Sequence, residues 1–314
     1  MRTHCRHTDL PPSARGASAA IGNFDGVHLG HRHVLDIARA RAGELNAPLG
    51  VVTFEPHPRQ VFAPDAPPFR LMNAEARAHR LERIGVETLF ELPFDTDLAA
   101  LTPDAFAREV LRDGLGLSHV VVGADFRFGK DRAGTADMLE RLGQELGFGV
   151  TAAPLLQDRG LEVSSTRIRK ALSDGEPERA AAMLGHLHRI EGPVIGGERR
   201  GRDLGYPTAN MALDGLHLPR LGVYAVTVDI LTGPHAGTHG GVASLGVRPM
   251  FGENTPNLET FLFDFSGDLY GEHLSVALVG FIRPELKFDD VDALVARMDE
   301  DSAEARALLA HPRA

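Results

Sequence analysis

The stretch GNFDGVHLGH, residues 22–31, decides the fold of the first half of the chain. It follows the apolar run SAAI at 18–21 and precedes a segment, 31–45, whose apolar residues recur at helical spacing. Its glycines let the backbone approach a ligand closely at a helix entrance, where unpaired amides attract anions. This order predicts a strand, a phosphate-binding turn and a helix, which is how a parallel α/β sheet begins.

Apolar runs and helix patterns continue to alternate up to about residue 184. A second helix is expected at 73–84, and a third begins after Thr102, an N-cap residue followed by Pro103. Phe106 and Val110 would lie on the apolar face of that third helix. The pattern predicts a mostly parallel sheet covered on both faces, with ligands at the carboxyl ends of its strands. The further strand runs are LGVVTF (49–54), TLFEL (88–92), SHVVVG (118–123) and FGVTAA (148–153).

After about residue 185 the pattern changes to short strands separated by glycines and prolines. The run at 222–231 alternates with the period of two that is typical of an antiparallel strand. Asp290 would cap a last helix, in which Val291, Leu294, Val295 and Met298 form the stripe that packs on the strands. We expect an α/β domain at 1–185 and an antiparallel β-barrel with a terminal helix at 186–314.

The composition narrows the class of protein. The 314 residues include 33 Lys and Arg against 43 Asp and Glu, a formal net charge of −10, which argues against a broad basic surface for nucleic acid. Cys5 is the one cysteine, which excludes an internal disulfide and fits a reducing compartment. No apolar run approaches a membrane span of about 20 residues, and the polar start has no signal-peptide core. We expect a cytoplasmic protein with an exposed, disordered start that includes His4 and His7.

Two segments of the first half are candidate anion sites. His28 and His31 lie three residues apart at a helix entrance, so both imidazoles could point at one phosphate during attack on a nucleoside triphosphate. The alternatives are two surface histidines on a capped helix or, with His33, a metal site. In SSTRIRK, residues 164–170, hydroxyls at a helix start stand beside two arginines; the alternative is an ordinary capped helix.

Other segments could hold a flat ring, a metal ion or a base. TFEPHPRQVF (53–62) and VVGADFRFGKDRAGT (121–135) place phenylalanines at strand ends, where they form either ring walls or core. In GERRGRDLGYPTANM (197–211), Thr208 and Asn210 offer the hard oxygen ligands that Mg²⁺ prefers. Glu259 interrupts an apolar strand and is either a general base for an alcohol or a solvent-facing side chain.

These motifs, in this order and over residues 17–310, resemble the bifunctional prokaryotic riboflavin kinase/FMN adenylyltransferase family, also called FAD synthetases. The resemblance implies a Rossmann-like nucleotidylyltransferase domain followed by a six-stranded riboflavin-kinase barrel. It implies that ATP phosphorylates riboflavin to FMN with Mg²⁺, and that a second ATP adenylylates FMN to FAD with release of pyrophosphate. The expected partners are these small molecules, with no nucleic acid and no membrane.

The resemblance also implies roles for individual residues, carried over by position. The catalytic residues would be His28, His31, Arg167 and Glu259, and the Mg²⁺ ligands Thr208 and Asn210. The ATP and phosphate contacts would be Gly22, Asn23, Phe24, Gly30, Ser164, Thr166, Arg169, Gly197, Arg200 and Gly201. The flavin contacts would be Phe54, Pro56, His57, Pro58, Phe62, Asp125, Phe126 and Phe128.

The chain departs from the family pattern at two positions in VASLGVRPMF, where Ser244 replaces an asparagine and Met250 a threonine. Two other functions stay open at this point. One is a single-activity adenylyltransferase with an inactive barrel, and the other is a flavin-binding regulatory module without turnover. The PTAN motif together with Glu259 argues against the first, and the intact His28, His31, Arg167 and Glu259 argue against the second.

Overall fold

The computed structural model describes residues 1–158, 161–196, 205–250 and 253–311. The chain forms two structural units. The first comprises Met1–Pro67 and Arg77–Val163, and the second comprises Pro68–Ala76 and Ser164–Ala314.

The first unit is built on a six-stranded sheet whose order is β1-β4-β3-β2-β5-β8 and whose neighbours all run parallel. The five predicted apolar runs form β2, β3, β4, β5 and β8, which confirms the parallel α/β sheet, whereas β1 was not predicted. The order reverses at β2, which has β3 on one side and β5 on the other. Its strands are β1 (Arg2–His4), β2 (Ser18–Ile21), β3 (Leu49–Glu55), β4 (Thr88–Pro93), β5 (His119–Gly123) and β8 (Gly149–Ala153).

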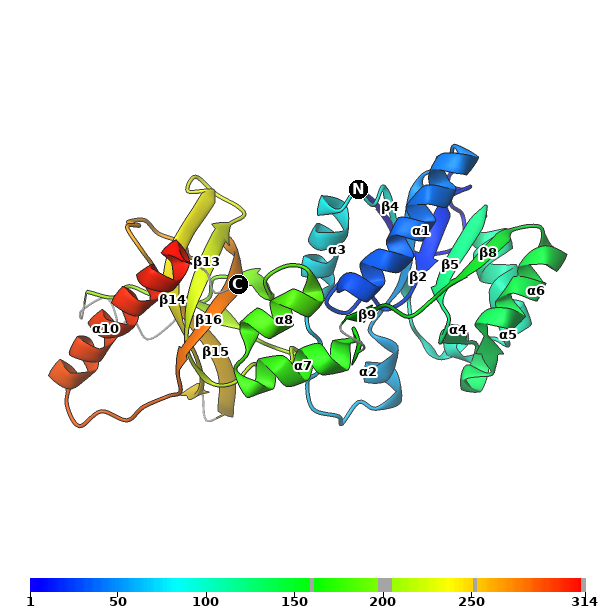
Figure 1. Ribbon diagram of the computed structural model, residues 1–314. Coiled ribbons are helices and arrows are strands. Elements are labelled where there is room, and N and C mark those ends of the chain that lie inside the picture. Colours follow the sequence, from blue (N-terminus) through cyan, green and yellow to red (C-terminus); the bar gives the residue numbers. More distant parts are fainter. Residues whose placement is uncertain (159–160, 197–204, 251–252, 312–314) are drawn as a thin grey trace. The chain divides into compact units, whose positions relative to one another are not determined.

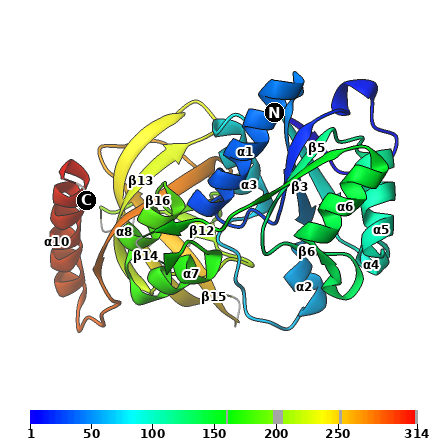
Figure 2. The same ribbon diagram turned by 45° about the vertical axis from the view of Figure 1, so that its right-hand side comes forward.

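Helices cover both faces of this sheet. Figures 1 and 2 show α1 (Leu29–Leu45) and α6 (Ala136–Leu146) on opposite sides of the strands. Ile21 and Val52 pack with α6 and with the helix at Phe106–Gly114 in one apolar core. The shorter elements are η1 (Pro12–Ala14), α2 (Pro58–Phe62), α4 (Thr96–Ala100), α5 (Pro103–Ala105), β6 (Arg127–Phe128), η3 (Lys130–Arg132), β7 (Gly134–Thr135), β9 (Gln157–Asp158) and β10 (Leu161–Glu162).

The helix after Thr102 differs from the prediction in its winding. The Thr102 hydroxyl caps it as expected, accepting the Ala105 N–H at 3.2 Å. From Phe106 to Gly114, however, the turns are those of a π-helix, η2. Because π-turns bond five residues apart, Phe106 and Val110 still share the buried face.

The start of the chain is ordered, so the predicted disordered terminus is wrong. Residues 2–4 form β1, which pairs in parallel with β4 at the edge of the sheet. The His4 ring stacks on Phe90 with 5.7 Å between centroids. Residues 2–4 therefore pair with backbone groups of β4 that would otherwise form an open strand edge, which is a template for another strand.

The second unit is the predicted antiparallel barrel. Its strand order is β11-β16-β13-β14-β15-β12, and Ile195 N donates to Asn210 O at 2.9 Å, which joins the two edges. Tyr224 and Val226 face its core, while Val223 packs outward against the last helix. The strands are β11 (Arg189–Pro193), β12 (Ala209–Ala212), β13 (Gly222–Ile230), β14 (Gly237–Met250), β15 (Glu253–Leu262) and β16 (His273–Arg283).

The last helix, α10 (Val291–Ala310), is capped by Asp290 as predicted, but it packs through its other half. Val291 is 56% exposed and the predicted stripe Leu294, Val295 and Met298 is only half-buried, whereas Ala305 and Leu308 are buried. The apolar row continues along the helix, and its fully buried apolar members lie in the second half.

Asp301 is also buried on that face of α10. Its carboxylate accepts from Nε and Nη2 of Arg283, at the end of β16, and from Nε of Arg297 at 3.0 Å. Two arginines thus compensate the buried charge and tie the helix to the strand.

Three segments outside the barrel belong to the second unit. Helices α7 (Ser165–Asp174) and α8 (Pro177–Leu184) lie before the predicted boundary at 185/186, and α8 packs on β16. The segment 68–76, which leads into α3 (Ala74–Arg83), also packs here: His217 N donates to Arg70 O at 2.8 Å. None of the described helices is both long enough and apolar enough to cross a membrane.

Candidate active sites

The loop between β2 and α1 is held at the carboxyl end of the first unit's sheet. Gly22 donates its N–H to the β3 backbone, and Asn23 O accepts from the Thr53 hydroxyl at 3.3 Å. Phe24 and Val27 are buried with φ of 51° and 42°. Left-handed backbone is costly for such side chains, and strain of this kind gathers at functional sites. The loop also lies where the strand order reverses, which is where open α/β sheets bind ligands.

His28 and His31 cap helix α1 reciprocally. The His31 N–H donates to Nδ1 of His28 at 3.2 Å, and the His28 N–H donates to Nδ1 of His31 at 3.3 Å. The rings stack with centroids 3.6 Å apart and 14° between planes. A Cβ at Gly30 would stand 3.0 Å from the His28 ring, which explains a glycine there.

This cap decides which ring nitrogens can donate. Because each Nδ1 accepts a backbone N–H, the proton of each neutral imidazole is on Nε2. Burial lowers the pKa of His31 well below its usual value, and protonation of the adjacent His28 would lower it further. The helix entrance therefore offers N–H donors from stacked imidazoles. The predicted helix start is confirmed, and the anion-binding role stays a prediction.

The second predicted anion segment forms the start of α7. Ser164 is the N-cap by position, but its hydroxyl makes no capping bond, so the alternative of an ordinary side-chain cap at this residue is not observed. Arg169 donates from Nη1 to Phe69 O at 3.3 Å and from Nη2 to the Thr166 hydroxyl at 3.4 Å. Its guanidinium also lies 5.9 Å from the centre of the Phe69 ring. Arg169 is thus held by the second unit, and the phosphate roles of these residues and of Arg167 stay predictions.

The phenylalanines predicted as ring walls join a continuous row of aromatic contacts in the first unit. Phe54 and Phe128 are buried core residues, Phe126 is half-buried, and Phe62 is 68% exposed. Neighbouring rings along the row Phe62, Phe94, Phe54, Phe106, Phe128 and Phe126 have centroids 5.6–6.5 Å apart. Phe62 is thus the most exposed member of the row, while Phe94 and Phe126 are half-buried.

The turn after β3 carries the other predicted flavin contacts. The Glu55–Pro56 bond is cis, and Pro58 occupies the first turn of α2. His57 caps α2, since its Nδ1 accepts the Arg59 N–H at 3.1 Å. Asp125, after β5, is exposed.

In the second unit, the GYPTAN loop is fixed at Tyr206. The Tyr206 hydroxyl donates to the Asp299 carboxylate on α10, and its ring lies 4.8 Å from that of Phe261. Burial, with the bond to Asp299, raises the pKa of this phenol. The loop then enters β12 with Thr208 half-buried and Asn210 buried.

Asn210 and Glu259 meet through a residue that the sequence interpretation missed. They are register neighbours on β12 and β15. Asn257 donates from Nδ2 to Asn210 Oδ1 at 2.9 Å and to Glu259 Oε1 at 3.1 Å. The Asn257 Oδ1 atom is buried and has no hydrogen-bond partner among the described residues. The structure thus brings the predicted metal ligand and the predicted base together.

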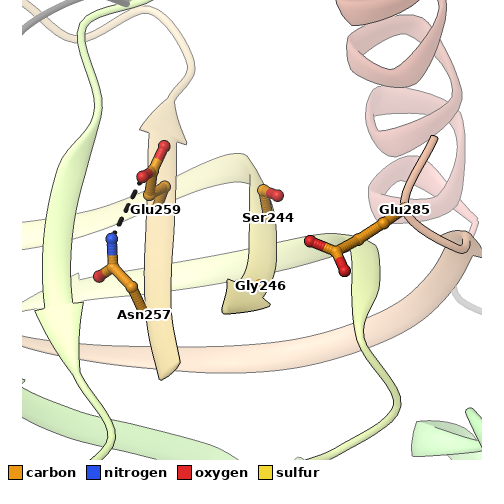
Figure 3. Close-up of a pocket in the computed structure, with 5 residues that line it drawn as sticks. All are labelled: Ser244, Gly246, Asn257, Glu259 and Glu285. Carbon is orange, nitrogen blue, oxygen red and sulfur yellow. Dashed lines mark hydrogen bonds between the residues drawn. The ribbon is translucent and has the colours of Figure 1, made fainter. Parts of the chain in front are cut away.

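Glu259 lies in a pocket on the outer face of the barrel, opposite the core residue Leu258. Figure 3 shows Ser244 between the carboxylates of Glu259 and Glu285 in this pocket, with Gly246 and Asn257 completing the lining. A side chain at Gly246 would collide with Glu285, because an added Cβ would be 2.5 Å from Oε1. The family departure at Ser244 therefore falls beside Glu259, its register neighbour. Gly197, Arg200, Gly201 and the Met250 side chain lie outside the described residues.

Comparisons with known proteins match both halves of the chain. The family profile described as FAD synthetase matches residues 10–167, and that of riboflavin kinase matches residues 184–309. A protein of Pseudomonas fluorescens called bifunctional riboflavin kinase/FMN adenylyltransferase is 43% identical over 303 residues, 96% of each chain. The chain belongs to this bifunctional family. An Escherichia coli K12 member of the family is 38% identical over 291 residues, 93% of this chain and 92% of its own.

A solved structure extends the likeness to three dimensions. It is titled as a macrolide-efflux protein from Streptococcus pneumoniae, is 32% identical and covers 97% of this chain and 98% of its own, with a TM-score of 0.83. The family membership confirms the resemblance read from the motifs.

Three residues that the sequence interpretation missed carry no local signal that could have identified them: Asn257 and Glu285, which line the pocket, and the buried Arg77. Asn257 stands two residues before Glu259 in the same strand, and only the pairing with β12 gives it its partner. Glu285 follows β16 and reaches the pocket through the fold. Arg77 is a fully buried arginine in the first unit.

Proposed function

We propose that the chain converts riboflavin to FAD in two ATP-dependent steps, each at its own site. It is a riboflavin kinase and an FMN adenylyltransferase, like the relatives it matches. The observation that carries the proposal is the match of both family profiles in one chain. The two half-reactions need different chemistry, and the two units supply different groups.

We assign adenylyl transfer to the loop at 22–31. The phosphate of FMN, with a second pKa of about 6, is a dianion at neutral pH and attacks the α-phosphorus of ATP without a base. Pyrophosphate leaves, and the charge on the phosphate oxygens is stabilised by the Nε2–H groups of His28 and His31 and by the start of α1. Ser164, Thr166, Arg167 and Arg169 belong to the second unit, and their expected phosphate roles stay predictions.

We place the flavin ring against the exposed ends of the phenylalanine row. Phe62 and Phe126 have ring surface to offer, whereas Phe54 and Phe128 support them from the core. An isoalloxazine ring gains apolar contact and stacking on such faces. Phe62 is the member whose loss should weaken flavin binding with little loss of stability.

We assign riboflavin phosphorylation to the pocket around Glu259. The 5′-hydroxyl of riboflavin is a poor nucleophile at neutral pH, so Glu259 would take its proton as the oxygen attacks the γ-phosphorus of ATP and ADP leaves. The Asn257 amide, 3.1 Å from Oε1, orients the carboxylate. Glu285 would limit the space beside the reacting hydroxyl.

The metal expected at this site is Mg²⁺, held by Thr208 and Asn210. The described residues contain no group of three or more His, Cys, Asp and Glu placed to bind a metal. Mg²⁺ needs few protein ligands when phosphate oxygens and water complete its octahedron. The buried, unpartnered Asn257 Oδ1 next to Asn210 is a further oxygen that fits a cation. The bound ion would offset the charge of the transferred phosphate.

One assay tests the two-step function. The purified chain is incubated with riboflavin, ATP and Mg²⁺, and the flavins are separated by chromatography. FAD supports both activities, FMN alone indicates a kinase, and no product indicates a binding module. Parallel reactions with a chelator, and with Mn²⁺ in place of Mg²⁺, test the metal.

The location and division of the activities are further proposals. A single exposed cysteine and the use of ATP suit the cytoplasm. We also propose that the activities divide near residue 185/186, which the two matched ranges, 10–167 and 184–309, support. Riboflavin phosphorylation by residues 186–314 alone would test that division.

A further inference from the structure

Arg77 is a buried cation for which neither reaction step above has a use. Its side chain is fully buried, although arginine is seldom buried without paired charges. Nη2 donates to Glu55 Oε2 at 2.9 Å and to Glu91 Oε2 at 2.7 Å, while Nη1 donates to Asn23 O at 3.3 Å. All four residues belong to the first unit.

The three acceptors come from three separate parts of the unit. Asn23 lies in the proposed phosphate loop, five residues before His28. Glu55 ends β3 and directly precedes the turn that carries the predicted flavin contacts. Glu91 lies in β4, the neighbour of β3, and fixes the guanidinium against the sheet.

We propose that Arg77 is a positioning residue for adenylyl transfer, which sets the phosphate loop and the flavin-binding turn at the distance that in-line attack requires. The inference rests on the proposed phosphate site at His28 and His31. Misplacing reacting groups by about 1 Å can cost about 10²-fold in rate. A planar guanidinium with several fixed donors can bind three acceptors in set directions, whereas a lysine ammonium acts as a single point charge.

A purely structural ion cluster would behave differently. Removing the cation leaves Glu55 and Glu91 partly buried without their partner, which destabilises the fold. Replacing Glu91 by glutamine as well removes the charge repulsion between the Glu55 and Glu91 carboxylates. It does not restore the N–H donor to Asn23 O. Stability and catalysis should therefore separate in the double variant.

The experiment compares Arg77→Met, Arg77→Lys and the double variant Arg77→Met/Glu91→Gln in the full chain. The measurements are kcat and KM for adenylylation of supplied FMN, thermal unfolding, and riboflavin phosphorylation as an internal control. We expect kcat for adenylylation to fall about 10²-fold in Arg77→Met, while the KM values for FMN and ATP stay within about threefold of those of the unmodified chain. The double variant should regain thermal stability but not kcat, and Arg77→Lys should recover kcat only in part.

Ser18→Ala is the matched control, because it removes a buried hydrogen bond from Ser18 to Ala38 O at the opposite end of β2. It should lower stability and leave kcat unchanged. Recovery of kcat together with stability in the double variant, or a folded Arg77→Met enzyme with normal kcat, would overturn the positioning role. A His28→Ala/His31→Ala variant runs in parallel: unchanged adenylylation there would refute the proposed phosphate site itself.

Discussion

Glu259→Gln separates a general base from a structural carboxylate in the barrel. Glutamine keeps the shape of the side chain, and its Oε1 can still accept from Asn257 at the observed 3.1 Å. The unfolding free energy should therefore change by no more than about 0.5 kcal/mol. Loss of basicity should lower kcat for FMN formation by about 10²- to 10⁴-fold, which is about 2.7–5.4 kcal/mol of barrier.

The assay measures FMN formation at saturating riboflavin and ATP, with adenylylation of supplied FMN as the second readout. Adenylylation should survive, because its proposed site lies in the other unit. Glu285→Gln is the matched control, since it removes the same charge from the same pocket. Equal loss of kcat in both variants would point to pocket charge rather than proton transfer, and a folded Glu259→Gln enzyme with normal turnover would refute the base.

Three further perturbations test the two units. His28→Ala with His31→Ala should abolish FMN adenylylation and spare riboflavin phosphorylation, because each lost donor costs about 2.7–4 kcal/mol; equal loss of both activities would contradict separate sites. Asp301→Asn should lower the free energy of unfolding in urea by about 2 kcal/mol or more, because Arg283 and Arg297 lose the buried anion they bind. Glu300→Gln, which removes an exposed carboxylate paired with Arg297, should cost less than about 1 kcal/mol. Burial lowers the pKa of His188 to about 3, whereas in the unfolded chain this imidazole has a pKa of about 6.5, so the folded state binds fewer protons between these values. The unfolding free energy should therefore fall by up to about 1.4 kcal/mol per pH unit as the pH is lowered from 6.5 towards 3. Acid unfolding of His188→Leu should show a flatter slope over that range.

Local patterns predicted the elements that local interactions decide. The strand at β13 and the helix at α1 form as predicted, because their apolar residues are buried: most of β13, and Leu35, Ala38 and Ala42 in α1, although Leu45 at the end of the predicted stripe is exposed. The stripe at the start of α10 misled the prediction, because burial depends on where the barrel surface ends. Ser164 illustrates a similar limit: a serine at this position favours a capping hydrogen bond, but its hydroxyl makes none in the structure.

The geometry of the candidate sites was predictable where it depends on neighbours in sequence. His28 and His31, three residues apart, had to meet at a helix entrance, although their reciprocal bonds depend on ring orientations that spacing does not specify. Asn257 reaches Asn210 across 47 residues, and Arg77 reaches Asn23 across 54. Contacts of that range follow from strand pairing and helix docking, which no local motif encodes.

The segment 68–76 affects the order in which parts of this protein can fold during synthesis. Its backbone pairs with residue 216, through the Arg70–Leu216 bridge, and Asn73 donates to Glu191 O at 2.9 Å. A ribosome synthesises this piece long before the rest of the second unit, so it has to wait without its partners while more than a hundred further residues emerge. Domains generally fold as units during synthesis, N-terminal first. Here the first unit can close around its own core early, but this stretch of chain can settle only after its partners near residues 191 and 216 have left the ribosome.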